Sequence, residues 1–181
     1  MNFEFAILDF IRNNLSCEPM DALMKFITFF GNAGWFWIAL ALILTFIPKT
    51  RKIGFTACLA LLLNLLLCNL TLKPLVARIR PYDLKQGIEL IIDAPHDFSF
   101  PSGHTSASFA AAFAVFFHNK KWGAGALAFA SLIAFSRLYL YVHFPTDILG
   151  GIVVGAVTAA IGYFVVKWIY KLIQNKKKNT V

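Results

Sequence analysis

The sequence predicts an all-α, polytopic membrane helix bundle of about five transmembrane helices, preceded by an interfacial N-terminal helix. Hydrophobic residues make up 59% of the 181 residues and charged residues only 14%, a balance far from that of soluble proteins. Apolar stretches close to the ~20 residues that cross a bilayer recur along the chain, separated by short polar or basic connectors. We therefore interpret residues 1–181 as a single membrane-embedded domain.

The apolar segments cover residues 35–47, 53–72, 104–117, 122–139 and 148–169. They follow an N-terminal arm, residues 1–33, which begins with an amphipathic pattern. One face of this pattern carries Phe3, Ile7, Leu8, Ile11 and Leu15. Such a face is typical of a helix lying in the membrane interface. Residues 20–30 also have a helical pattern, either inserted in the membrane or lying flat on it.

Lysine and arginine are concentrated in three connectors, which contain Lys49, Arg51 and Lys52, then Lys120 and Lys121, then Lys171 and Lys176 to Lys178. Short loops rich in these residues stay in the cytoplasm. The pattern therefore places the C-terminus and its basic tail, 172–181, in the cytoplasm. The N-terminal arm, the loop 82–100 and the turn 136–147 then face the extracytoplasmic side of the cytoplasmic (inner) membrane. Topology also accounts for the net charge of +8 without a nucleic-acid partner.

Basic residues at the outer end of the second apolar segment break this pattern. Lys73 and Arg80 are seven residues apart, about two helical turns, so on a continuous helix they would share one face before Pro81 ends it. Arg78 lies off that face, and contact with lipid headgroups is expected for it. The pair Lys73 and Arg80 indicates an anion site.

Two further segments carry chemistry on the same side of the membrane. In the first, Ser102 is placed to cap a helix whose first turn holds Gly103 and His104, and the free backbone N–H groups there favour an anion. In the second, Pro145 suits the first turn of a helix, and His143 precedes Asp147 by four residues, so one helical turn would let the carboxylate hold one imidazole nitrogen. The other nitrogen would remain available as a nucleophile.

Arg137 stands six residues before His143, which is off its face on a continuous helix. The chain must therefore turn between them if both contact one substrate. Together the segments supply cations, two histidines, an orienting carboxylate and a helix N-terminus, which are the parts of a phosphate site with its own acid and nucleophile.

The combined pattern is Lys73-x6-Arg80-Pro81, Pro101-Ser102-Gly103-His104 and Ser136-Arg137-x5-His143-x3-Asp147. It resembles the three-part signature of the type 2 phosphatidic acid phosphatase (PAP2) family of membrane lipid phosphatases. One departure is Tyr141, where relatives often have glycine.

The resemblance implies that His143 attacks phosphorus, Asp147 orients it, and His104 protonates the leaving oxygen and later activates water. It also implies a set of phosphate ligands, namely Lys73, Arg80, Ser102, Gly103 and Arg137. No cofactor or metal is expected. The acids Asp83, Glu89, Asp93 and Asp97, with His96, are predicted to form a solvated lid instead of a metal cage.

Several functions remain open at this stage. The favoured substrate is undecaprenyl diphosphate, with phosphatidylglycerophosphate, phosphatidic acid and lipid A as alternatives. A lipid phosphotransferase would use the same residues with an acceptor other than water. A channel or transporter is the non-enzyme alternative, although the charges gather at one face and not along the membrane midplane. Vanadate haloperoxidases resemble the family in their pocket but are soluble.

Overall fold

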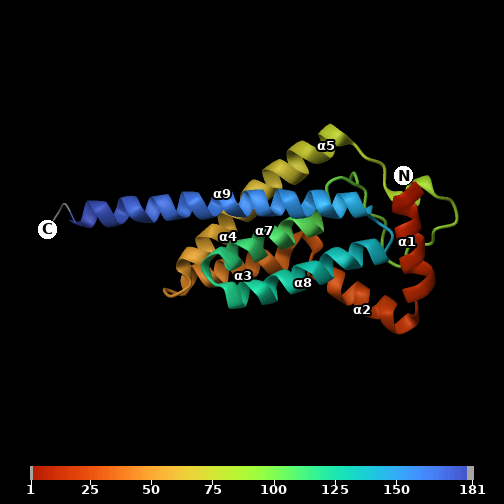
Figure 1. Ribbon diagram of the computed structural model, residues 1–181, viewed down its shortest axis with the longest axis horizontal. Coiled ribbons are helices and arrows are strands. Elements are labelled where there is room, and N and C mark those ends of the chain that lie inside the picture. Colours follow the sequence, from red (N-terminus) through yellow and green to blue (C-terminus); the bar gives the residue numbers. More distant parts are fainter. Residues whose placement is uncertain (1, 179–181) are drawn as a thin grey trace.

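A computed structural model describes residues 2–178 of the chain, and the side chains of residues 3–176. The fold is all-helical, as predicted, and no strand occurs within these residues (Figure 1). The helices are α1 (Asn2–Leu15), α2 (Glu18–Phe29), the 3-10 turn η1 (Asn32–Gly34), α3 (Trp35–Phe46), α4 (Arg51–Asn64), the π-helical η2 (Leu65–Leu72), α5 (Lys73–Val76), α6 (Pro81–Leu84), α7 (Gly103–His118), α8 (Lys120–Tyr139) and α9 (Pro145–Lys178). The last residues of the predicted basic tail, 179–181, lie outside the described residues.

Helix α7 lies at the centre of the bundle, where it packs against α4, α8 and α9. Its contact with α9 is close because two glycines of α9 face its backbone. A Cβ atom added at Gly155 would lie 2.7 Å from the backbone oxygen of Ser106, and one at Gly151 would lie 2.9 Å from that of Ser102. The small residues that the sequence places four apart therefore serve helix packing, as in other membrane bundles.

Two helical stretches are long and apolar enough to cross a membrane, Arg51–Leu84 and Pro145–Lys176. A third is obtained if α2 and the η1–α3 stretch, bent by 41° at their junction, form one broken span. Helix α7 does not qualify because it has 16 residues and carries buried serines and threonines. Its surroundings are other helices and not lipid, so it does not need an apolar surface all round. The count of five spans stays a prediction.

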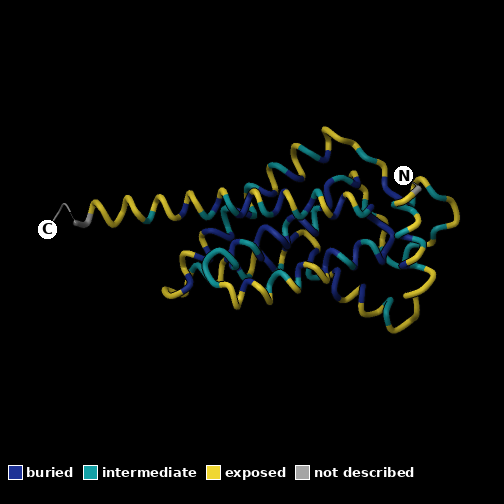
Figure 2. The backbone as a smooth tube through the Cα atoms, viewed as in Figure 1, coloured by how far each residue is buried: buried dark blue, intermediate teal, exposed yellow. Residues whose placement is uncertain are grey.

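Apolar side chains cover the outside of the bundle, as the membrane location of the protein requires. Phe46, Leu75 and Phe164 are among the most exposed of them. Buried residues concentrate in the body of the bundle, whereas the C-terminal half of α9 projects beyond the other helices and is exposed (Figure 2).

The two ends of the bundle differ (Figure 1). The α3–α4 and α7–α8 turns lie toward the end from which the C-terminus projects, while α1, the loop after α6 and the α8–α9 turn lie at the opposite end. Helix α1 crosses that opposite end. Its predicted apolar face is only partly available to lipid, because Leu8 and Ile11 are buried against the protein whereas Phe3 is 76% exposed.

The predicted helix from Lys73 to Arg80 is wrong. Helix α5 ends at Val76, Ala77 adopts a left-handed conformation with φ of 48°, and the chain leaves the helix until Pro81 begins α6. Nothing in the sequence marks this end, because alanine favours helix and rarely adopts positive φ. Lys73 and Arg80 therefore reach the same place by a change of chain direction, not along one helix face.

Tyr141 is a second non-glycine residue with left-handed backbone, at φ of 60°. It lies in the α8–α9 turn, where its N–H donates to the Leu138 carbonyl. Its side chain is fully buried with Leu8 and Phe144, and its hydroxyl donates to Asp9 of α1 at 2.8 Å. The left-handed conformation explains why glycine suits this position. The tyrosine side chain adds buried apolar contacts and a hydrogen bond to α1.

We expect Tyr141→Gly to destabilise the protein. Relief of the left-handed backbone is worth about 1–2 kcal/mol, whereas loss of a buried aromatic side chain costs roughly 3–5 kcal/mol. The midpoint of thermal unfolding in detergent should therefore fall, while Phe10→Ala, which truncates an exposed aromatic residue of α1, should change it little. An unchanged or higher midpoint in Tyr141→Gly would contradict this account.

Candidate active site

A cavity of about 1170 Å³ lies at the α1 end of the bundle and brings the three sequence segments together. Its polar lining includes Lys73, Arg80, Asp97, Gly103, His104, Arg137 and His143. The chain does turn between Arg137 and His143, as expected, because α8 ends at Tyr139. Of the predicted site residues, Ser102 and Asp147 do not line the cavity itself.

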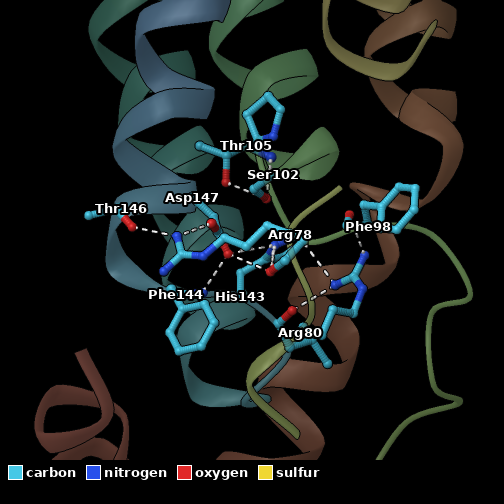
Figure 3. Close-up of polar contacts among 12 residues, drawn as sticks. Arg78, Arg80, Phe98, Ser102, Thr105, His143, Phe144, Thr146 and Asp147 are labelled. Atoms are coloured by element: carbon cyan, nitrogen blue, oxygen red, sulfur yellow. Dashed lines mark hydrogen bonds and ion pairs between the residues drawn. The ribbon is translucent and has the colours of Figure 1, made fainter. Parts of the chain in front are cut away.

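His143 lies in the turn between α8 and α9 and is 1% exposed. Its Nδ1 is 3.5 Å from Asp147 Oδ2 and 3.5 Å from Ser99 Oγ, while its Nε2 is 3.3 Å from Arg80 Nη1 (Figure 3). A carboxylate can only accept a hydrogen bond, so we assign the proton to Nδ1. The lone pair of Nε2 then faces Arg80 Nη1.

Burial lowers the pKa of His143 to about 3, because a charged imidazolium would lose its hydration. The hydrogen bond to Asp147 opposes this shift, and the positive charge of Arg80 adds to it. The ring is therefore neutral at pH 7, the form in which Nε2 keeps its lone pair.

Asp147 is fully buried in the first turn of α9, and donors surround its carboxylate. Oδ2 accepts from the Ser99 hydroxyl at 2.5 Å and from the Phe144 N–H at 2.7 Å, the second bond closing the N-terminus of the helix. Oδ1 accepts from Arg78 Nη1 at 2.6 Å. Pro145 begins the helix, as predicted.

Two of these donors were missed by sequence reasoning. Arg78 was assigned to lipid headgroups, which is wrong, because its guanidinium binds Asp147 and Glu4 of α1. Arg78 could have been identified from the sequence, because it is a basic residue at the outer end of an apolar segment, the same feature that indicates Lys73 and Arg80. Ser99 gave no signal, since a single serine in a loop has no spacing to interpret.

Lys73 and Arg80 converge on the carboxylate of Asp97. Arg80 Nη2 donates to Asp97 Oδ1 at 2.5 Å and Arg80 Nε to the Asp97 carbonyl at 2.7 Å, while Lys73 Nζ donates to Oδ2. Burial alone would raise the pKa of Asp97, but the hydrogen bond from Lys73 and the charge of Arg80 lower it. Asp97 belongs to the predicted solvated lid and its side chain is 56% exposed, but its carboxylate also pairs with two cations of the site, which the sequence did not indicate. Within the described part of the chain, no three His, Cys, Asp or Glu side chains are grouped to hold a metal ion.

Arg137 is 2% exposed, and its charge is not neutralised by the protein. Nη1 donates to Thr28 Oγ1 of α2 at 2.6 Å, while the buried Nε has no hydrogen-bond partner. Among the described side chains it has no carboxylate partner. A buried, unpaired cation is costly, so this site is built to receive an anion.

His104 lies in the first turn of α7, beside the break between α2 and α3. Its Nε2 is 2.9 Å from Asn32 Oδ1, a partner that the sequence did not indicate. A Cβ atom at Gly31 would lie 2.5 Å from the imidazole Cδ2, so glycine is needed for this close approach. The break in the helix therefore positions Asn32 against the ring.

Ser102 caps α7, as predicted. Its buried Oγ accepts from the Thr105 N–H at 3.4 Å and from the Thr105 hydroxyl at 3.0 Å. Gly103, the next residue, lines the cavity beside Lys73 and Asn69. The role of Ser102 as a phosphate ligand stays a prediction.

The cavity continues from this polar end into an apolar region between α3 and the α4–η2 stretch. This region is lined by Ile38, Ala41, Cys58, Leu61, Leu62 and Leu65. Ile38, Leu62 and Leu65 are 44%, 54% and 46% exposed, so the region is open along its side. We call it the apolar groove.

Comparison with known proteins assigns the arrangement to a family, since residues 53–176 match the PAP2 superfamily. The chain belongs to this family. The predicted resemblance is confirmed, and with it the enzyme class, a hydrolase of phosphoric ester bonds.

Two solved PAP2 structures are similar to this chain. LpxE from Aquifex aeolicus superimposes with a TM-score of 0.78 at 26% identity, over 88% of this chain and 94% of LpxE. A transmembrane PAP2-type phosphatidylglycerolphosphate phosphatase from Bacillus subtilis gives a TM-score of 0.72 at 28% identity, over 95% and 86% of the two chains.

Curated PAP2 relatives are similarly distant. The chain is 29% identical to an undecaprenyl-diphosphatase of Sulfolobus acidocaldarius, over 86% of this chain and 75% of the relative. It is 32% identical to the undecaprenyl-diphosphatase BcrC of Bacillus subtilis, over 87% and 80%.

We expect Asp97→Asn to bind inorganic orthophosphate more tightly, because the substitution removes the carboxylate that pairs with Lys73 and Arg80. An exposed ion pair is worth up to about 1 kcal/mol, so the loss of one such competing pair should raise the affinity by up to about 5-fold. Titration calorimetry of the purified protein would measure it. Asp93→Asn, an exposed position on the same loop and cavity, is the matched control. Weaker binding by Asp97→Asn would mean that this carboxylate holds the cations in their phosphate-binding positions.

Proposed function

We propose that this PAP2 protein is a metal-independent lipid phosphate phosphatase that works through a phosphohistidine intermediate. The observation that carries the proposal is the continuity of one cavity, which joins buried cations and His143 to the apolar groove. A phosphorylated headgroup fits the polar end, and the hydrocarbon of the same molecule fits the groove. Such a pairing matches a membrane lipid and no water-soluble ester.

In the first step His143 Nε2 attacks the terminal phosphorus, and the bond between this phosphorus and the oxygen that stays on the lipid product breaks. The leaving oxygen takes a proton from His104, and Asp147 stabilises the positive charge on His143 through Nδ1. In the second step His104 takes a proton from water, whose oxygen attacks the phosphohistidine. Orthophosphate leaves, and both imidazoles return to their starting state.

The phosphoryl oxygens are held by Lys73, Arg80, Arg137 and the Gly103 amide, with Ser102 at the edge of this set. Charge that develops on these oxygens is stabilised by fixed cations and a helix N-terminus, the role that a metal ion takes in other phosphatases. For the phosphate to reach Lys73 and Arg80, the carboxylate of Asp97 moves aside.

The favoured substrate is undecaprenyl diphosphate. Support comes from the names of the curated relatives, two of which are undecaprenyl-diphosphatases. Phosphatidylglycerophosphate, lipid A phosphate and phosphatidic acid are the alternatives. The first is named for the similar Bacillus subtilis structure, and the second for a relative described as a lipid A 4'-phosphatase. Transfer of the phosphoryl group to a lipid acceptor is the remaining alternative reaction.

The site opens on the extracytoplasmic side of the cytoplasmic (inner) membrane in our proposal, with the C-terminus in the cytoplasm. Support comes from the lysine and arginine distribution, since the basic α3–α4 and α7–α8 connectors lie toward the end opposite the site (Figure 1).

The function predicts that purified protein in EDTA releases orthophosphate from undecaprenyl diphosphate, and that His143→Ala abolishes this release. Loss of a nucleophile should cost at least about 1,000-fold in kcat. Rapid quenching with phosphorus-32 substrate should give an acid-labile label on the wild-type protein and none on the variant.

The control for His143→Ala is its thermal unfolding midpoint, which should show a folded protein. Normal turnover in the variant would disprove the nucleophile. Activity that EDTA removes and Mg²⁺ restores would disprove metal independence, and a preference for another lipid in a substrate panel would replace undecaprenyl diphosphate.

The orientation predicts that Asp93→Cys reacts with a membrane-impermeant thiol reagent in intact cells, whereas Lys121→Cys reacts only after lysis. Asp93 lies in the loop after α6 and Lys121 in the first turn of α8, and the loop after α6 and the α7–α8 turn lie toward opposite ends of the bundle (Figure 1). Native Cys17, Cys58 and Cys68 are first replaced by serine or alanine. The opposite labelling pattern would place the site in the cytoplasm.

A further inference from the structure

Arg78 is the centre of a network that the reaction steps above do not use. Its Nη1 donates to Asp147 Oδ1 and to Thr146 Oγ1, both at 2.6 Å, and its Nη2 donates to Glu4 Oε2 at 2.6 Å (Figure 3). Its Cζ lies 4.2 Å from the ring centroid of Phe144. One guanidinium therefore joins the turn that carries His143, the first turn of α9 and helix α1.

The hydrogen bonds of Asp147 are divided between its two oxygens. Oδ2 faces Ser99, the Phe144 N–H and His143 Nδ1, whereas Oδ1 accepts from Arg78 alone among the described residues. Removal of Arg78 would leave a fully buried oxygen without a partner, which is costly. The carboxylate would then rotate or take up a proton, and either change would weaken its bond to the imidazole.

Glu4 fixes Arg78 in turn. Its Oε1 accepts from the Thr146 hydroxyl at 2.5 Å, while Oε2 accepts from Arg78, so the three side chains close a ring of hydrogen bonds. Glu4 and Arg78 are 13% and 23% exposed, so the ring is largely shielded from water. Helix α1 is thereby attached to the carboxylate that orients His143.

Arg78 does not act on the substrate phosphate directly. Its side chain does not line the cavity that holds His143 and His104, although it lies at a smaller neighbouring pocket on the other side of Arg80. Its positive charge is paired with two carboxylates, those of Asp147 and Glu4.

We propose that Arg78 is a positioning residue that keeps His143 in its reactive tautomer through Asp147, and that Glu4 of α1 holds Arg78 in place. The proposal rests on the proposed function of His143. It gives α1 a part in catalysis, beyond contact with the membrane interface.

The test compares Arg78→Gln with wild type by two measurements. Mutation of a residue that orients a reacting group through another costs about 10- to 100-fold, so kcat and the rate of phosphohistidine formation should fall by that factor. KM should stay within about 3-fold, because no phosphate contact is lost. Independently of turnover, ¹⁵N spectra of labelled histidine should show a single Nδ1–H tautomer for His143 in wild type and a mixture in the variant.

Conservative variants distinguish positioning from a general loss of structure. Arg78→Lys keeps the charge beside Asp147 and should recover part of the rate, while Glu4→Gln should lose about 3- to 10-fold because Arg78 keeps its other partners. Arg12→Gln, in the same helix as Glu4, is the matched control and should keep wild-type kcat, because Arg12 donates to the Glu89 carbonyl and lies 5.9 Å from the Tyr141 ring centroid, outside the Arg78 network. If Arg78→Gln does not fold, Arg78→Lys and Glu4→Gln carry the test.

The outcomes separate this proposal from the proposed function. If the wild-type protein has no phosphatase activity but the His143 tautomer still changes in Arg78→Gln, the proposed function is contradicted and the positioning role is supported. An active wild type with unchanged kcat and tautomer in Arg78→Gln would overturn the positioning role. A rise in KM alone would make Arg78 a phosphate ligand.

Discussion

The carboxylate of Asp147 is the group on which the local structure of the site depends. It is fully buried, and a buried charge is tolerated only where donors and cations replace water. Its donors come from different parts of the chain: Ser99 from the long loop, Phe144 from the α8–α9 turn and Arg78 from the segment after α5. The need to supply hydrogen-bond donors to this one carboxylate therefore brings these three segments together. His143, which faces the cavity, lies beside them.

Unlike Asp147, the cations of the cavity are not fully neutralised by the protein. Among the described side chains, buried Arg137 has no carboxylate partner, and Lys73 and Arg80 share the carboxylate of Asp97. The folded protein thus carries an excess of positive charge before any ligand arrives. Such fixed charge costs folding free energy but needs no rearrangement when negative charge develops on a bound phosphate.

The sequence predicted the parts of this structure that depend on local pattern. Hydrophobic segments located the long helices, and Pro145 and Ser102 located two helix starts. It failed where a contact joins distant residues or where the backbone departs from its propensity. Ala77 ends a helix in a conformation that alanine disfavours. Asn32, Asp97 and Ser99 stand at sequence distances from the site residues they contact that match no helical or motif pattern. Their positions depend on the packed bundle, which no local pattern contains.

Because the apolar groove is open along its side, the rate of this protein should depend on the concentration of substrate in the membrane and not on its bulk concentration. Leu62 and Leu65 are about half exposed on the lipid-facing surface, so a lipid would enter sideways, from the bilayer, without leaving it. Encounter then takes place by two-dimensional diffusion, and the relevant quantity is the mole fraction of substrate in the membrane or micelle. Adding more detergent at constant substrate would dilute the substrate on that surface and slow the reaction, although its bulk concentration is unchanged.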